Sequence, residues 1–210
     1  MAQRFLISQD SPVLYITIVT KNRLPAFHTN RMCSLLCQSI IEARKSGGFL
    51  LFAYVIMVDH LHLLASRRST TSDVLRVLKG ITAHRIIDYL KTNGHDSSLA
   101  KLQHQEQKQK HRYSLWQTEK NVLPVFSERM FLEKLNYTHR NPVRAGLAEC
   151  IDDYRWSSAR IWRGRPLPNE PLLMDKDLIH WRSSYRHRYA PGALRVRHSR
   201  VGSSSGSGVS

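Results

Sequence analysis

Two histidines separated by one residue are the first candidates for chemistry in this chain. His60 and His62 flank Leu61 and follow a strongly apolar run over residues 49–57. Residues i and i+2 of a strand point to the same face, so the two imidazoles would lie side by side while Leu61 faces the core. Two neutral imidazoles at this spacing can hold a divalent cation. A pair of surface histidines on an alternating strand is the simpler alternative, and it is the more common meaning of H-x-H taken alone.

A tyrosine on the polar side of a helix is the second candidate. At about 100° per residue, Tyr137 lies away from the apolar stripe that contains Phe131 and Leu135. Asn141 and Lys134 fall near it on the same side. The pattern is compatible with a phenol held over a polar site, with the Asn141 oxygen one turn on as a ligand. The alternatives are a half-packed surface tyrosine and an asparagine that caps the helix.

Excess positive charge is the third signal. Lys and Arg total 32 and Asp and Glu total 16, which gives a formal net charge of +16. This imbalance favours a polyanionic partner, most simply nucleic acid, over an anionic membrane surface. Cations neutralise phosphates and aromatic faces stack on unpaired bases, although a solvated role is the alternative for any single arginine. The candidate DNA-binding residues are Arg67, Arg68, Lys79, Arg85, Arg112, Trp116, Lys134, Arg140, Arg144, Arg155 and Trp156.

The elements that must position these residues follow from periodicity and turn signals. The order β-α-β-β-α-β, followed by a helix, predicts an α+β fold of the ferredoxin-like type, with one antiparallel sheet, helices on one face and a further helix that carries Tyr137. Residues 95–112 are polar and rich in Gln and Lys, and they predict a solvated segment. The expected strands are 13–20, 49–57, 61–65 and either 114–117 or 122–126. The expected helices are 32–45, a long helix that begins after the cap cluster 69–73 and ends near 91, and 128–141. A short helix or a docked loop is expected within 152–162.

Composition along the chain predicts one domain over residues 1–165, a basic extension over 166–200 and a flexible tail over 201–210. Cys33 and Cys37 lie on a helical stripe with apolar neighbours, so core packing is favoured over half of a metal site. Three cysteines without framework spacing predict a reducing compartment. We expect neither a signal peptide nor a spanning helix, and a cytoplasmic, nucleoid-associated protein.

Five segments in order resemble a known family. They are VIMVDHLHLL (55–64), KGITAHRI (79–86), LWQ (115–117), LEKLNYTHRNPVRAGL (132–147) and DDYRWSSAR (152–160). The chain resembles the HUH single-tyrosine transposases over about residues 10–162, and within them the REP-associated tyrosine transposases of the IS200-like group. The tyrosine four residues before Asn-Pro is far more specific than H-x-H. Where the family commonly carries Pro-Asn before the first histidine, this chain has Val58 and Asp59.

The resemblance implies a metal-dependent cleavage and strand transfer of single-stranded DNA that carries a palindromic hairpin. It assigns a divalent ion, Mg²⁺ or Mn²⁺, to His60, His62 and Asn141, and it assigns attack on a DNA phosphate to Tyr137. The product would be a 5′-phosphotyrosine and a free 3′-hydroxyl. A phenol is protonated at neutral pH, so the attack needs help from the metal or from Lys134.

Three points stay open at this stage. A DNA-hairpin-binding protein that has lost catalysis would show the same charge and aromatic residues. A metal-dependent nuclease that does not use a tyrosine is a further alternative. Relatives include dimers and monomers, so the chain is expected to be either a monomer or a homodimer, with no membrane partner.

Overall fold

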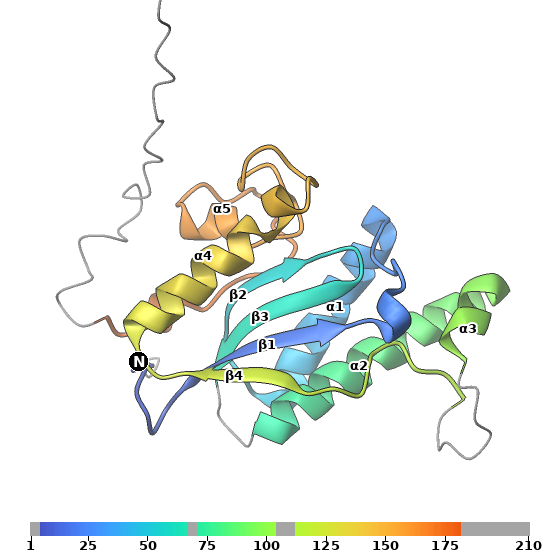
Figure 1. Ribbon diagram of the computed structural model, residues 1–210, viewed down its shortest axis with the longest axis horizontal. Helices are drawn as coiled ribbons and strands as arrows, with labels where there is room; N and C mark the ends of the chain where they lie inside the picture. Colours follow the sequence, from blue (N-terminus) through green and yellow to red (C-terminus); the bar gives the residue numbers. More distant parts are fainter. Residues whose placement is uncertain (1–4, 67–70, 104–111, 182–210) are drawn as a thin grey trace, which may run out of the picture.

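A four-stranded antiparallel sheet forms the middle layer of the protein (Figure 1). The structure is a computed structural model and describes residues 5–66, 71–103 and 112–181. In chain order the elements are β1 (Val13–Val19), η1 (Lys21–Arg23), α1 (Asn30–Gly47), β2 (Leu51–Ile56), β3 (His60–Ser66), α2 (Thr71–Thr92), α3 (Asp96–Leu102), β4 (Asn121–Val125), α4 (Glu128–Arg144), α5 (Ala159–Trp162) and η2 (Lys176–Leu178).

Local sequence explains where the main elements begin and end. The β-branched run of β1 suits a pleated, buried strand. The Thr29 side chain accepts a hydrogen bond from the backbone N–H of Met32 and so caps α1, which ends at Gly48 with a left-handed φ of 60°. The Ser127 side chain caps α4 in the same way, by accepting from the N–H of Met130.

The strand order is β2-β3-β1-β4, and every neighbouring pair is antiparallel. This is the order expected when a β-α-β-β-α-β chain folds into a ferredoxin-like sheet, so the predicted α+β class is confirmed. In the register of β1 against β3, Thr17 lies opposite His62 and Val19 lies opposite His60. These pairs place the H-x-H segment next to the centre of the sheet.

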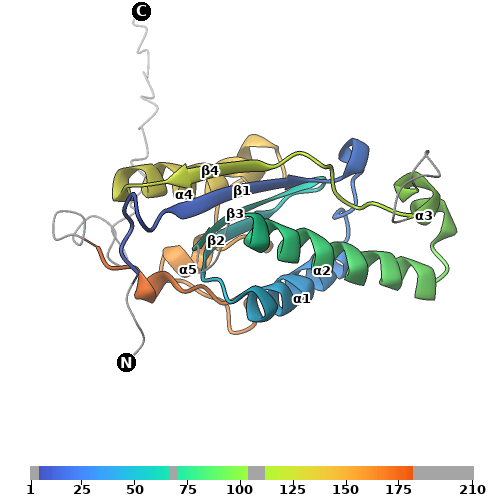
Figure 2. The same cartoon turned by 90° about the horizontal axis from the view of Figure 1, so that it is seen from below.

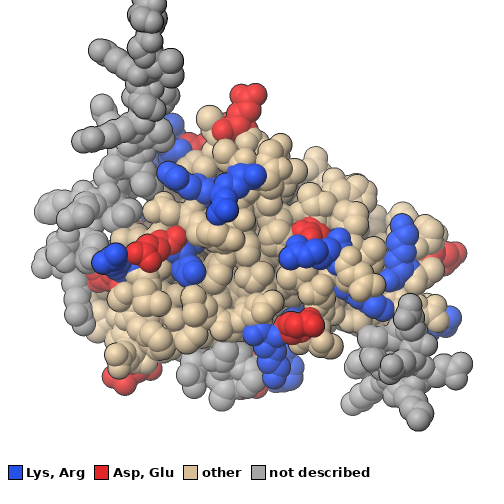
Figure 3. Space-filling model, in the orientation of Figure 1, with Lys and Arg blue, Asp and Glu red and all other residues tan. Residues whose placement is uncertain are grey.

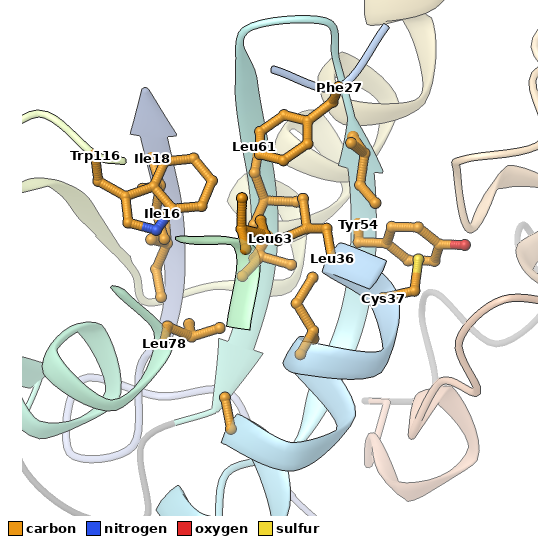
Figure 4. Packing of buried hydrophobic residues seen from close by; sticks show 14 of the residues in the cluster. Ile16, Ile18, Phe27, Leu36, Cys37, Tyr54, Leu61, Leu63, Leu78 and Trp116 are labelled. Carbon is orange, nitrogen blue, oxygen red and sulfur yellow. The ribbon is translucent and has the colours of Figure 1, made fainter. Parts of the chain in front are cut away.

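The two faces of the sheet carry different helices (Figure 2). Helices α1 and α2 cover one face, where Ile16 and Leu61 pack against Leu36 and Leu78 (Figure 4). Helix α4 covers the opposite face and contacts β2 and β3, with Phe131 fully buried there. The prediction of helices on one face plus a separate helix bearing Tyr137 therefore agrees with the observed layers.

Cys33 and Cys37 belong to the core between the sheet and α1, as the apolar stripe predicted. Burial raises the pKa of the Cys33 thiol to about 12, and burial also raises that of Cys37. Both thiols are therefore held in the neutral form, which is a poor metal ligand. Among the described helices, none is both long and apolar enough to cross a membrane.

Two elements differ from the sequence prediction. The segment 95–112 was predicted to be solvated throughout, but it contains helix α3, because Leu99 and Leu102 are buried against the core. The remaining polar stretch, residues 104–111, lies outside the described residues. Helix α4 does not stop before Pro142 and continues to Arg144. A proline in the last turn removes only one backbone hydrogen bond, and Pro142 is itself buried.

The segment after residue 165 packs onto the sheet and helices as far as it is described. Arg160 forms a buried ion pair with Glu170 at 3.0 Å. Arg44 forms an ion pair with Asp175. The backbone of Ile179 forms an isolated parallel β-bridge with that of Phe5. Residues 182–200 of the predicted basic extension and the predicted tail 201–210 lie outside the described residues.

Loss of the Arg160–Glu170 pair should destabilise the protein strongly. The two side chains are only 7% and 2% exposed, so Glu170→Gln leaves a buried guanidinium without its counter-charge. We expect the free energy of unfolding, measured in urea, to fall by about 3 kcal/mol. The matched control is Glu133→Gln, which removes the partner of Arg129 from an exposed pair and should cost less than about 0.5 kcal/mol. Equal losses in the two variants would contradict this account.

Candidate active site on the α4 face of the sheet

Both histidines project from β3 toward α4. Their ring centroids are 4.8 Å apart and the rings are nearly perpendicular, at 80°. Leu61, between them, is fully buried on the opposite face with α1 and α2. Strand alternation therefore presents the two imidazoles side by side, in the arrangement that the spacing predicted.

His62 is the more deeply buried of the two, with 5% of its surface exposed. Its Nδ1 atom lies 2.9 Å from the Tyr15 hydroxyl and 2.9 Å from the Thr17 hydroxyl. Burial, with smaller effects of His60 and Lys134, lowers the pKa of His62 to about 3. The ring is therefore neutral at physiological pH, which is the form that binds metal.

His60 is held by a carboxylate instead of hydroxyls. Its Nδ1 atom lies 2.5 Å from Oδ1 of Asp59, and Oδ2 of Asp59 accepts a hydrogen bond of 2.9 Å from Arg23. Burial alone would raise the pKa of Asp59, but the hydrogen bonds from His60 and Arg23 together lower it. An ionised carboxylate only accepts, so it requires the proton on Nδ1 and leaves the lone pair on Nε2 of His60.

The corner before His60 is fixed from the β1 side. The Thr20 side chain donates to the carbonyls of Leu24 and Asp59, and the Thr20 N–H also donates to Asp59. The backbone of Asn22 and Arg23 is left-handed, with φ of 52° and 51°, and this turn brings the Arg23 guanidinium to Asp59.

Tyr137 reaches the histidines from α4. Its ring centroid is 5.8 Å from that of His62 and 6.2 Å from that of Tyr15, and 41% of its surface is exposed. The Arg144 guanidinium lies 5.5 Å from the Tyr137 ring, and the Lys134 ammonium lies 5.1 Å from the Tyr15 ring. Lys134 precedes Tyr137 by three residues and Arg144 follows it by seven, so both cations lie on the helix face that carries Tyr137. The Tyr137 ring is thus partly exposed and contacts the His62 imidazole and the Arg144 guanidinium.

Asn141 follows one turn after Tyr137, and its amide nitrogen donates a 2.9 Å hydrogen bond to the Tyr137 carbonyl. This bond leaves the amide oxygen as the remaining acceptor. Within the described residues, no group of three or more His, Cys, Asp or Glu could hold a metal. Imidazole nitrogens and amide oxygens are both ligands that divalent ions accept.

Tyr15 is a site residue that sequence reasoning missed. It lies on β1, is only 8% exposed and stacks on His62 with an interplanar angle of 15°. Burial raises the pKa of Tyr15 to about 12, so its phenol stays protonated and acts as a hydrogen-bonding partner. No local signal marks Tyr15, because its contact with His62 depends on the pairing of two strands. Of the two phenols, only Tyr137 combines exposure with proximity to the histidines.

Two of the predicted DNA-stacking residues are core residues. Trp116 is 4% exposed, packs on Phe27 and donates its indole N–H to Thr82. Trp156 is 9% exposed and donates to Asn30. Burial in this structure leaves neither ring an open face on which a base could stack.

Other predicted DNA contacts are dispersed. On α2, Lys79 donates to the carbonyls of residues 117 and 119, and Arg85 pairs with residue Glu42 of α1. Arg112 lies over Tyr113, and Arg155 lies over Trp156. These four residues do not join the histidines.

Three of the predicted DNA-binding residues share the Tyr137 helix, namely Lys134, Arg140 and Arg144. Arg140 is exposed. Figure 3 shows Lys and Arg side chains gathered over the part of the surface where α4 ends. Arg67 and Arg68, which follow β3 directly, lie outside the described residues.

Two buried histidines should make stability depend on pH. Burial lowers the pKa of His139, as of His62, to about 3, whereas an unfolded histidine titrates near 6.5. The unfolded chain binds more protons between these values, so this contribution to stability is complete above about pH 6.5 and is lost as the pH falls toward about 3. Each histidine contributes up to about 1.4 kcal/mol per pH unit.

Urea unfolding in the presence of a chelator, at about pH 7 and pH 5, measures this slope. Histidine NMR spectra provide the second readout, because the rings of His62 and His139 should remain neutral at the lower pH. Titration of these two rings near their unfolded value would contradict the prediction.

Comparisons with known proteins agree with this architecture. A family model described as "Transposase IS200 like" matches residues 12–128, a range that contains both histidines and ends before Tyr137. No curated protein matches the chain. A REP-associated tyrosine transposase bound to a REP hairpin is similar in structure, with a TM-score of 0.55 and 18% identity over 84% of this chain and 92% of that one.

A putative transposase from Deinococcus radiodurans R1 is 23% identical over 60% of this chain and 86% of that one, with a TM-score of 0.42. The first of these structures shares the fold seen here. Because the family model matches more than half of the chain, the protein belongs to the family of IS200-like transposases.

Proposed function

We propose that this transposase is a metal-dependent endonuclease and strand transferase for single-stranded DNA, with Tyr137 as the nucleophile. The observation that carries the proposal is the position of Tyr137, an exposed residue of α4 whose ring centroid lies 5.8 Å from that of His62. An exposed phenol beside the His62 imidazole, whose neighbour is His60, and beside the Arg144 guanidinium suits attack on a phosphate. A surface tyrosine without a catalytic role would not require a histidine and an arginine beside its ring.

The proposed reaction exchanges one phosphate ester for another. The Tyr137 oxygen bonds to the scissile phosphorus, the bond from phosphorus to the 3′-oxygen breaks, and the phenol proton leaves to solvent while the 3′-oxygen takes up a proton. The products are a 5′-phosphotyrosine and a free 3′-hydroxyl. Because the ester energy is kept, a second 3′-hydroxyl can reverse the step and join two strands, so no nucleotide cofactor is needed.

His60 and His62 would hold the metal through their Nε2 atoms, with the Asn141 amide oxygen as a further ligand. When bound, a divalent ion polarises the scissile phosphate and offsets the charge that develops on it. The chain's own residues position the DNA: Lys134 and Arg144, with the exposed Arg140, offer positive charge along the same helix face. Positioning and charge neutralisation are the main sources of catalysis in phosphoryl transfer.

We infer that the DNA partner carries a hairpin. The chain has a net charge of +16, which suits a folded polyanion, and a structurally similar transposase is bound to a REP hairpin. The histidines and Tyr137 come from one chain, so either a monomer or a homodimer would hold the complete site.

Tyr137→Phe should abolish the covalent adduct between the protein and DNA. The test incubates hairpin-bearing single-stranded DNA with Mn²⁺ and separates protein that carries DNA on a denaturing gel. Tyr15→Phe is the matched control, since it removes the other phenol of the site. We expect that control to form the adduct at lower yield, because Tyr15 orients His62.

An undiminished adduct in Tyr137→Phe would remove the proposed nucleophile and favour a tyrosine-independent nuclease. DNA binding by the wild type without any adduct would instead favour a hairpin-binding protein that has lost catalysis.

Asp59→Ala should weaken Mn²⁺ binding, because the Asp59 carboxylate fixes the orientation and the protonated nitrogen of His60. Loss of such a partner typically reduces metal affinity about 10- to 100-fold. Isothermal titration with Mn²⁺ measures the affinity without any DNA. Glu133→Ala, which removes an exposed carboxylate from α4, is the control and should leave the affinity unchanged. Equal affinities in the two variants would show that the Asp59 contact plays no part in metal binding.

A further inference from the structure

A pocket of about 490 Å³ lies on the other side of the sheet, away from α4, between the start of α1, the end of α2 and α3. This volume is within the range of small-ligand sites. Its floor is apolar and includes Met32, Ile86, Leu90, Leu102 and Leu115. These residues are buried or line the core, so the floor is a fixed part of the fold.

The rim of the pocket is cationic and aromatic. The Arg31 guanidinium lies 5.2 Å from the centroid of Tyr89, and the His95 ring lies 5.7 Å from the same ring at a tilt of 33°. The other polar residues that line the pocket are His28, Thr29, Ser98 and Lys101. Neither Asp nor Glu is among the residues that line the pocket. Flat groups over an apolar floor, with positive charge around them, match a nucleobase attached to phosphates.

The pocket and the proposed active site share one end of the sheet. Residues 24–26, 28 and 29 line the pocket. Phe27, among them in the chain, donates a 2.9 Å hydrogen bond from its N–H to the carbonyl of Val58, two residues before His60. The Thr20 hydroxyl donates to the carbonyls of both Leu24 and Asp59. The same corner therefore contacts both the wall of the pocket and the segment that leads into His60.

We propose that this pocket takes an unpaired nucleobase of the single-stranded DNA that the α4 face cuts. The strand would pass over the end of the sheet from the histidines to the pocket, with the base between the Arg31–Tyr89–His95 group and the apolar floor. Lys101 would lie near the adjoining phosphate. The inference rests on the proposed function, since it takes single-stranded DNA as the substrate.

The test separates contacts to bases from contacts to phosphates. In the Tyr137→Phe background, fluorescence anisotropy compares a labelled oligo-dT strand with an abasic strand of the same length. Both probes carry the same backbone charge, so the ratio of their affinities reports base binding. Arg31→Ala and Tyr89→Leu remove the cation and the aromatic face, and the leucine keeps apolar volume at residue 89. The control is Arg76→Ala, an exposed residue of α2 that does not line the pocket.

We expect each pocket variant to weaken oligo-dT binding by about fivefold or more, with little change for the abasic strand. The control should lower both affinities equally or neither. Equal losses for both probes in the pocket variants would mean that the rim contacts only phosphates, and no loss for either would mean that the pocket holds no DNA. Both results overturn the proposal.

A normal Tyr137 adduct in wild-type protein alongside either of those results would leave the proposed function standing and remove the pocket alone. If the protein neither binds oligo-dT nor forms an adduct with hairpin DNA, both proposals fail. Thermal unfolding of the variants checks the fold, and Arg31 is an exposed side chain whose loss leaves the core intact.

Discussion

The pairing of β1 with β3 is the constraint on which the site depends. Its register sets Thr17 opposite His62 and leaves Tyr15 within hydrogen-bonding distance of the same imidazole, although these residues are more than 40 positions apart in sequence. A shift of one residue would turn His60 and His62 into the α1 and α2 core and bring Leu61 out to α4. The alternation of apolar residues that stabilises the sheet therefore also makes the His60 and His62 side chains point toward α4.

The two histidines look equivalent in sequence but are held by different chemistry. His60 is partly exposed and bonded to an ionised carboxylate, whereas His62 is buried against two hydroxyls. Both arrangements secure Nδ1 and leave Nε2 for a ligand when Nδ1 carries the proton. In both cases the partner comes from the sheet or from the corner before it, so the rings are oriented by the rigid part of the fold.

Much of this arrangement could be predicted from sequence, because local period decides it. Alternation in β3 places both imidazoles on one face, and the helical period of α4 places Tyr137 away from Phe131 and Leu135, as the structure shows. The β-α-β-β-α-β order of elements was enough to predict the antiparallel sheet and the helices that cover it. Predicting these features requires only the residue pattern within one strand or helix, or the known ways in which such elements pack.

The remainder depends on contacts between distant segments. The sequence around Tyr15 does not indicate its contact with His62, because that contact forms only when β1 pairs with β3. Trp116 and Trp156 were predicted to stack on bases because they lie among arginines, but the fold buries both. Helix α3 has too few apolar residues for a periodic signal, and it exists because Leu99 and Leu102 find a core to pack against. Tertiary burial overrides composition in each case.

Only Phe126 and Ser127 separate the end of β4 from the start of α4. So short a connection ties the helix to the sheet edge, and apolar residues such as Phe131 anchor its inner side. The Tyr137 phenol and the His62 imidazole consequently lie close together within a single chain. In the proposed reaction, the nucleic acid strand would therefore have to approach a phenol whose own freedom is mainly the rotation of its side chain.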